Sequence, residues 1–192
     1  MKKLLLLITI LYFAISCNEQ KQQTEKSSVS EEKPYSWEDY PNENTKTKII
    51  NTRTTIDDKE LIARLEKSFK KDKFKIESEI NGGGNSYGNC NDNLTLEIKG
   101  NGTKHYFVKR TEAKPKNYYP DFSMSVYEFE TEEETVAAEN EIKKAFSSWN
   151  GFCNGKSPNY IVRYKNQIVH LHTRAEMFRG YIKDYAEKIR TY

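Results

Sequence analysis

An uncharged apolar run at the N-terminus, residues 4–16, is the feature that most constrains what this chain can fold into. The run directly follows Lys2 and Lys3 and ends in small residues, which is the pattern of a secretory signal peptide. Coiled as a helix, it would rise only ~20 Å, short of the hydrocarbon core of about 30 Å that a membrane-spanning helix must cross. We therefore expect the fold to be built from the residues after position 17, in an exported protein.

The run ends in Ala14-Ile15-Ser16-Cys17, which resembles the lipobox of bacterial lipoproteins, where a small residue precedes the cysteine that is acylated. The resemblance covers residues 1–17 and indicates a processing route. It implies that Cys17 carries acyl chains such as palmitate, which anchor it stably because each buried methylene contributes ~0.8 kcal/mol. The protein would then lie in the cell envelope, on the outer membrane where the cell has one. The alternative is an ordinary cleaved signal peptide with an incidental cysteine.

Residues 18–48 are rich in Glu, Lys, Gln, Ser, Thr and Asn. Such a composition cannot bury enough apolar surface to offset the entropy of ordering, so we expect a flexible tether that spans ~30 Å root-mean-square. Its aromatic residues gather at Pro34–Pro41. This stretch is a docking motif, a strap packed on the domain, or an aromatic patch on a flexible tether without a role of its own. Residues 49–192 have the size of one ordinary domain.

The balance of charges excludes one class of partner. Removal of Lys2 and Lys3 leaves 29 of the 31 basic residues against 28 acidic ones. Because the two signs are interspersed, the sequence predicts neither a nucleic-acid-binding face nor a strong footprint for anionic membranes. We assign no nucleic-acid partner.

Three segments combine a helix N-cap with apolar residues at helical spacing. The first begins at Asp57 and carries an apolar stripe that ends at Phe69. The second begins at Thr131, where three glutamates suit the positive end of the helix dipole. The third begins at Thr173, with Glu176 as the other half of a capping box. We expect a helix in each segment.

Alternation of apolar and polar residues predicts six strands around these helices. Their approximate ranges are 74–80, 94–98, 104–110, 122–129, 160–164 and 168–172. The resulting order is α-β-β-β-β-α-β-β-α. Short hairpin connections with few crossovers favour an α+β domain, in which a mostly antiparallel sheet is covered by its helices on one face.

Two cysteines remain after Cys17, namely Cys90 and Cys153. An even pair in an oxidising envelope favours a disulfide bond. Closing a loop of about 64 residues would contribute ~4 kcal/mol to stability in the chain-entropy model. Two free thiols and a metal site are the alternatives, although the spacing contains no Cys-x-x-Cys motif.

Candidate binding residues come from two loop-like stretches. The glycine-rich stretch Gly82–Asn89 contains Tyr87 and indicates either a mobile hairpin loop or a recognition loop. It lacks the lysine and the spacing of phosphate- and dinucleotide-binding loops. Tyr118, Tyr119 and Phe122 lie in a proline-flanked stretch, and exposed aromatic residues are favoured contacts for proteins and sugars. Binding and structural roles are both open for these side chains.

His170 and His172 lie two residues apart on a predicted strand, so their side chains share a face. They could bind a metal ion with Glu176 as a third ligand, or serve a hydrolase. The alternative, which alternation favours, is that Val169 and Leu171 face the core while both histidines face solvent. The sequence contains no Gly-x-Ser-x-Gly and no His-Glu-x-x-His motif, and we assign no catalytic residue, metal or cofactor.

These features favour a lipid-anchored envelope protein whose domain binds another macromolecule, as an inhibitor, an immunity-type protein or an accessory subunit. A domain that binds a small ligand or a glycan is the second hypothesis, and it predicts a concave pocket lined by tyrosines. An envelope hydrolase that uses His170 and His172 is the third. It requires an acidic partner within hydrogen-bond reach of these histidines.

Overall fold

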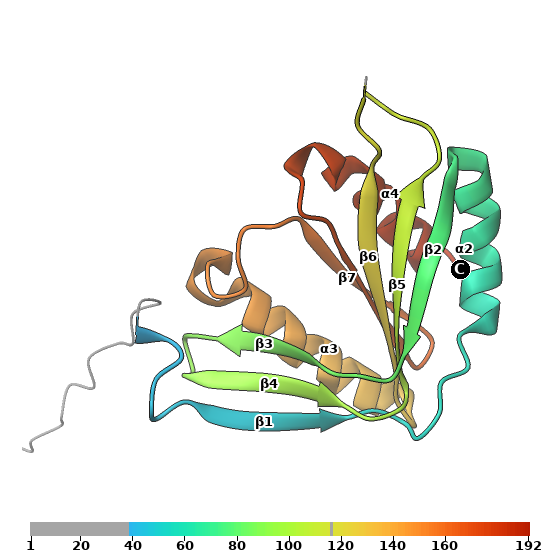
Figure 1. Ribbon diagram of the computed structural model, residues 1–192. Helices are drawn as coiled ribbons and strands as arrows, with labels where there is room; N and C mark the ends of the chain where they lie inside the picture. Colours follow the sequence, from blue (N-terminus) through green and yellow to red (C-terminus); the bar gives the residue numbers. More distant parts are fainter. Residues whose placement is uncertain (1–38, 116) are drawn as a thin grey trace, which may run out of the picture. The chain divides into compact units, whose positions relative to one another are not determined.

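The computed structural model of the protein describes residues 39–115 and 117–192, which belong to one compact unit, Pro34–Tyr192. The predicted signal peptide, Cys17 and most of the predicted tether lie outside the described residues. Within these residues the chain forms an α+β domain with three helices and eight strands in two sheets (Figure 1). No helix in this part of the chain is long and apolar enough to cross a membrane.

The elements follow one another as β1 (Lys46–Asn51), α2 (Lys59–Asp72), β2 (Phe74–Asn81), β3 (Asn85–Asn89), β4 (Leu94–Lys99), β5 (Thr103–Arg110), β6 (Asp121–Glu128), α3 (Glu132–Ser147), β7 (Asn159–Tyr164), β8 (Gln167–His172) and α4 (Arg179–Arg190). Five strands form an antiparallel sheet in the order β2-β5-β6-β8-β7. The other three form a smaller sheet in the order β1-β4-β3, in which β1 runs parallel to β4.

Helices α2 and α4 cover one face of the five-stranded sheet. Leu61, Leu65 and Phe69 recur at helical spacing in α2, and all three are buried. Alternate strand residues such as Met124 in β6 and Leu171 in β8 belong to the same core and are inaccessible to solvent. The neighbours of these strand residues must point to the other face, because side chains alternate along a strand.

Helix α3 packs on that other face, together with the smaller sheet. Ile142 and Ala145 of α3 form a second core with Ile168 of β8 and Ile98 of β4. Ile168 precedes Val169, which belongs to the first core. Consecutive buried residues show that β8 is covered on both faces, as apolar runs without alternation do in general. The expectation that all helices cover one face of the sheet is therefore wrong.

The sequence does not predict two of the eight strands, because both are polar. β1 reads Lys-Thr-Lys-Ile-Ile-Asn and is largely exposed at the edge of the smaller sheet, so no alternation is visible. It includes Lys46–Lys48, residues that the composition assigns to the tether. β3 reads Asn-Ser-Tyr-Gly-Asn, in which Tyr87 is the one large side chain. Much of the glycine-rich stretch is therefore a strand rather than a mobile loop.

The predicted helix starts agree with the structure to different degrees. Thr131 caps α3 as predicted, with its hydroxyl oxygen accepting a backbone N–H of the first turn at 3.1 Å. Helix α2 begins one residue later than predicted, with Asp58 rather than Asp57 at the N-cap position. Thr173 forms no capping box. Its hydroxyl instead donates to the Asp121 carbonyl at 2.9 Å, and a short 3₁₀ turn precedes α4.

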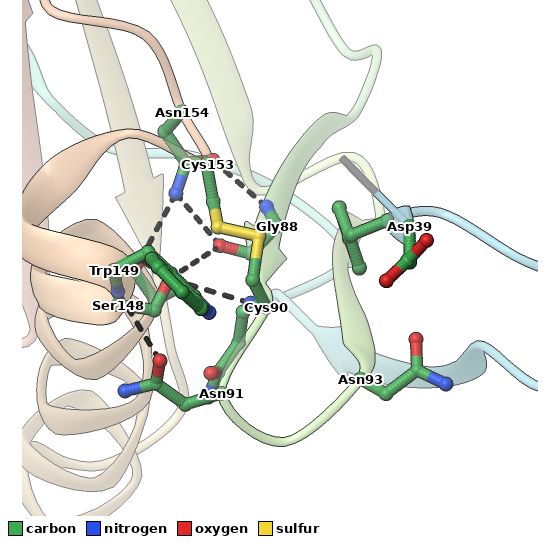
Figure 2. The surroundings of a disulfide bond; sticks show 12 residues. Asp39, Gly88, Cys90, Asn91, Asn93, Ser148, Trp149, Cys153 and Asn154 are labelled. Carbon is green, nitrogen blue, oxygen red and sulfur yellow. Dashed lines mark hydrogen bonds between the residues drawn. A yellow bond between two sulfur atoms is a disulfide. The ribbon is translucent and has the colours of Figure 1, made fainter. Parts of the chain in front are cut away.

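A disulfide joins Cys90, just after β3, to Cys153, beyond the end of α3, which confirms the predicted pairing. Figure 2 shows the hydrogen bonds that surround it. The Asn154 side chain accepts the Gly88 N–H at 2.8 Å and donates to the Gly88 carbonyl at 2.7 Å. Ser148 Oγ accepts the Cys90 N–H at 3.4 Å. These contacts fix β3 to the chain that follows α3.

Tyr40 holds the start of the described chain against the smaller sheet. Its hydroxyl lies 2.7 Å from Thr95 Oγ1 and 3.2 Å from the Leu94 carbonyl oxygen. Its ring lies so close to Gly88 that a Cβ atom added there would be only 2.7 Å away. Residues 34–38 of the predicted aromatic stretch lie outside the described residues, and for the part that is described the contacts of Tyr40 support a strap on the domain.

Candidate functional site

A pocket of about 350 Å³ opens on the face of the five-stranded sheet opposite to α2 and α4. We call it the histidine pocket, because it gathers all three histidines of the sequence. Its walls are formed by β2, β3, β5, β6 and β8. The lining residues include no acid, lysine or arginine among the described residues, and they are Ser78, Ile80, Asn85, His105, Tyr106, Phe107, Ser123, Ser125, His170 and His172.

The register of the strands explains why these side chains meet. His105, Ser125 and His170 are direct neighbours across β5, β6 and β8, so they form one row on the same face. Ser123 and His172 form the next row, on β6 and β8. Side chains directly opposite each other in antiparallel strands are about 5 Å apart at Cβ, close enough for one small ligand to touch both rows.

His170 is the most enclosed of the three histidines in the pocket, with 8% of its surface exposed. Its Nδ1 lies 3.0 Å from the Tyr87 hydroxyl, which in turn lies 2.6 Å from the Tyr127 hydroxyl. The rings of Tyr87 and Phe146 contact the imidazole at 5.5 Å and 5.2 Å between centroids. Its Nε2 is buried and has no hydrogen-bond partner within the described residues. One side of the imidazole is therefore held in place and the other is unsatisfied.

Asn85 of β3 completes this part of the wall. Its Nδ2 donates to Ser125 Oγ at 3.3 Å and also to the Tyr127 hydroxyl. Asn85 and Tyr87 both belong to β3, the strand whose end is fixed by the disulfide of Cys90. The disulfide thus positions two side chains that support the pocket from the smaller sheet.

The three histidine side chains of the pocket have lowered pKa values. Burial is the main cause that lowers the pKa of His170 to about 3, and the neighbouring His172 and His105 lower it further. Burial also lowers the pKa of His105 and of His172. All three imidazoles are therefore neutral at pH 7, and each offers one hydrogen-bond donor and one acceptor.

The predicted face-sharing of His170 and His172 is observed, and Val169 and Leu171 are buried in the core as the alternative required. The same alternative placed both histidines in solvent, whereas His170 is buried. The candidate third ligand, Glu176, pairs with an arginine of α4 at 2.8 Å and does not line the pocket. No group of three or more His, Cys, Asp or Glu in the described ranges is placed to hold a metal ion.

The tyrosine and phenylalanine candidates separate into two groups. Phe122 and Tyr87 are 2% and 4% exposed, so neither is available as a surface contact. Tyr87 supports the pocket through its contacts with His170 and Tyr127. Tyr118 and Tyr119 are exposed, in the loop between β5 and β6.

Sequence reasoning missed His105 and Ser125 as site residues. Alternation placed His105 on the opposite face of its strand from Tyr106 and Val108, which is the only signal that the sequence offers. Bringing it beside His170 requires knowing that β6 pairs with both β5 and β8.

One hydrogen bond resembles part of a hydrolytic site. Ser125 Oγ lies 2.8 Å from His105 Nδ1, within the distance at which a base takes a proton from a nucleophile. Such sites are completed by an acidic group that orients the histidine. No acidic residue of the described chain lines this pocket, so the third group of such a site is not found in its wall.

Neither family models nor curated proteins nor solved structures give a match to this chain.

Proposed function

We propose that the histidine pocket of this domain binds a small, neutral ligand rich in hydroxyl groups, such as a sugar. The observation that carries the proposal is Nε2 of His170, a buried polar atom without a partner in the described chain. Leaving such an atom unsatisfied is destabilising by about 1–3 kcal/mol. Because the atom is closed to solvent, a ligand hydroxyl would satisfy it once the adjoining wall of the pocket opens on binding.

The other lining residues match a sugar, which presents both hydroxyl groups and apolar C–H surface. Ser123, Ser125 and Asn85 offer further uncharged donors and acceptors, and Ile80 and Phe107 offer apolar surface. Small-molecule sites in general combine an apolar wall with a few polar groups that fix orientation. A charged ligand would find no counter-charge among the described lining residues, so recognition here rests on neutral hydrogen bonds.

A macromolecular partner, the first hypothesis from the sequence, has less support from the fold. It needs exposed contact residues, and of its four candidates Tyr87 and Phe122 are buried in the two cores, whereas Tyr118 and Tyr119 are exposed. The pocket is therefore the stronger basis for a function.

The lipobox residues support a second part of the proposal, that Cys17 is acylated and holds the domain in the cell envelope. The disulfide between Cys90 and Cys153 agrees with an oxidising compartment. In this setting the domain would capture its ligand outside the cytoplasm, near the membrane that carries it.

The test is a titration of the compact unit, residues 34–192, with a panel of neutral mono- and disaccharides, read by the imidazole ¹H–¹⁵N resonances. We expect a saturable shift of the His105, His170 and His172 signals with at least one sugar. The melting temperature should rise as well, because a ligand at ten times its Kd adds about 1.4 kcal/mol to the free energy of unfolding.

Two matched variants locate the binding. Ser123→Phe fills the pocket from an exposed position of β6 and should abolish the shifts. Ser86→Phe adds the same ring to an exposed position of β3 outside the pocket and should leave them intact. Sugars that move no imidazole signal, or that bind Ser123→Phe as well as the parent protein, would refute the proposal.

A further inference from the structure

A second pocket, of about 560 Å³, lies at the opposite side of the larger sheet, where α2 ends, β5 ends and α4 passes. We call it the basic pocket. Five cationic side chains line it, together with three acidic and two tyrosine side chains, and the cationic ones are Lys71, Lys73, Arg110, Lys114 and Lys188.

The acidic residues are largely neutralised by partners of their own. Asp72 accepts hydrogen bonds from Lys188 Nζ at 2.8 Å and from the Tyr185 hydroxyl at 3.1 Å. Glu187 pairs with Arg190, a residue outside the pocket lining, at 2.6 Å. Asp184 is the remaining acid of the wall.

The cations are not neutralised to the same degree. Lys71, Arg110 and Lys114 form no ion pair within the described residues, and Lys73 is 3.8 Å from the Glu112 carboxylate at the surface. The basic pocket therefore carries an excess of positive charge. The nearly neutral net charge of the chain excludes a broad basic face, but it does not reveal a local excess of this kind.

Arg110 gives the pocket a specific donor. Its Nε donates to the Asp72 carbonyl at 3.3 Å, while its Nη1 is buried and has no partner in the described chain. A guanidinium with free N–H groups matches the oxygen atoms of a phosphate. The negative end of the α2 dipole accounts for Lys71, but it does not account for Arg110 at the end of β5 or for Lys114 in the next loop.

Exposed aromatic side chains adjoin the basic pocket. Tyr118 and Tyr119 are 57% and 49% exposed, and the Tyr118 carbonyl accepts the N–H of Lys114 at 2.6 Å. In Figure 1 their loop, between β5 and β6, extends from the same end of the domain as the last turn of α2. Tyrosine beside lysine is typical of a surface that meets lipid headgroups, because its ring is apolar and its hydroxyl is polar.

We propose that the basic pocket binds the phosphate headgroup of an anionic phospholipid, with Tyr118 and Tyr119 at the membrane interface. Arg110 and Lys114 contact the phosphate, and the two tyrosine rings contact the region between headgroups and acyl chains. This site lies apart from the histidine pocket, and the proposal does not depend on it.

Co-sedimentation of residues 34–192 with vesicles tests this directly, because this unit lacks any acyl anchor. We expect binding to phosphatidylglycerol vesicles to exceed binding to phosphatidylcholine vesicles by about tenfold or more at low salt, and to fall as salt is added. The double variant Arg110→Gln/Lys114→Gln should lose most of this preference, and Tyr118→Ser/Tyr119→Ser should lose binding to both vesicle types.

Lys46→Gln/Lys143→Gln is the matched control, since it removes two exposed charges from β1 and α3, elements outside the basic pocket. It should bind as the parent does. Lys114→Glu, at an exposed loop position, repeats the test without touching the partly buried Arg110. Equal binding to the two vesicle types, or unchanged binding by Lys114→Glu, would overturn the proposal. Binding of glycerol 3-phosphate without any binding of vesicles would also overturn it, because the pocket would then serve a free phosphate ester.

Discussion

Replacing His170 with glutamine is expected to make the stability of the domain less sensitive to mild acid. Burial holds the pKa of His170 at about 3 in the folded protein, against about 6.5 in an unfolded chain. Between these values the unfolded state binds more protons than the folded state, so acidification favours unfolding. Above about pH 6.5, burial of His170 therefore does not lower the free energy of unfolding. As the pH falls from about 6.5 toward 3, the free energy of unfolding decreases progressively.

The size of this effect follows from the two pKa values. Each pH unit in the window removes about 1.4 kcal/mol from the free energy of unfolding, so about 2 kcal/mol is lost at pH 5 relative to neutral pH. The buried carboxylate of Glu128 does not add to this loss. Burial alone would raise the pKa of Glu128, but hydrogen bonds from the Asp57 N–H, Gln167 and Arg53 lower it overall. An acid of that kind loses its stabilising effect only below the unfolded pKa, near 4.

The assay is urea denaturation at a series of pH values from about 5 to 7.5, with the free energy of unfolding obtained by linear extrapolation. The parent protein should lose stability steeply across this range, and His170→Gln should be much flatter even where it is less stable at neutral pH. His172→Gln is the matched control and should change the slope less, because His172 is only partly buried. Equal slopes for the parent and His170→Gln would refute the claim that burial keeps His170 neutral.

Three substitutions test the packing that surrounds the site. Replacing Cys90 and Cys153 together by serine should lower the free energy of unfolding by about 4 kcal/mol in urea titrations, and an unchanged midpoint would contradict the chain-entropy argument. Thr131→Ala removes the side-chain cap of α3 and should lower it by about 1 kcal/mol, measured in the same way. Glu128→Ala leaves buried donors without an acceptor and should lower it by about 3 kcal/mol, whereas the exposed Glu130→Ala should have little effect by thermal denaturation.

Local patterns in the sequence predicted much of this fold. Six strands and three helices were predicted from periods of two and 3.6 residues, and the structure has all of them. The disulfide of Cys90 and Cys153 followed from the even number of cysteines after Cys17. Local rules worked here because each of these features is determined by residues close in the chain or by chemistry alone.

Features that depend on distant contacts were not predicted. β1 and β3 are polar, and each is a strand because β4 lies between them and pairs with both. In the same way, His170 and His172 were visible as a pair, but His105 joins them only through the order β5-β6-β8. The buried state of His170 depends on Tyr87 and Phe146, which come from β3 and α3. The spacing of apolar residues within a single helix or strand does not reveal such contacts between distant segments.

The path of the chain between the two sheets has a consequence for how the domain folds. β1 belongs to the smaller sheet, β2 to the larger one, β3 and β4 to the smaller one again, and the later strands return to the larger one. The β1–β4 pair therefore forms only after the chain has left the smaller sheet at the end of β1 and returned to it at β3. Closing such loops is slow, so we expect folding in roughly milliseconds to seconds rather than microseconds. Because each sheet interrupts the other in sequence, neither can persist as a separate fragment, and a single cut between β2 and β3 would divide both.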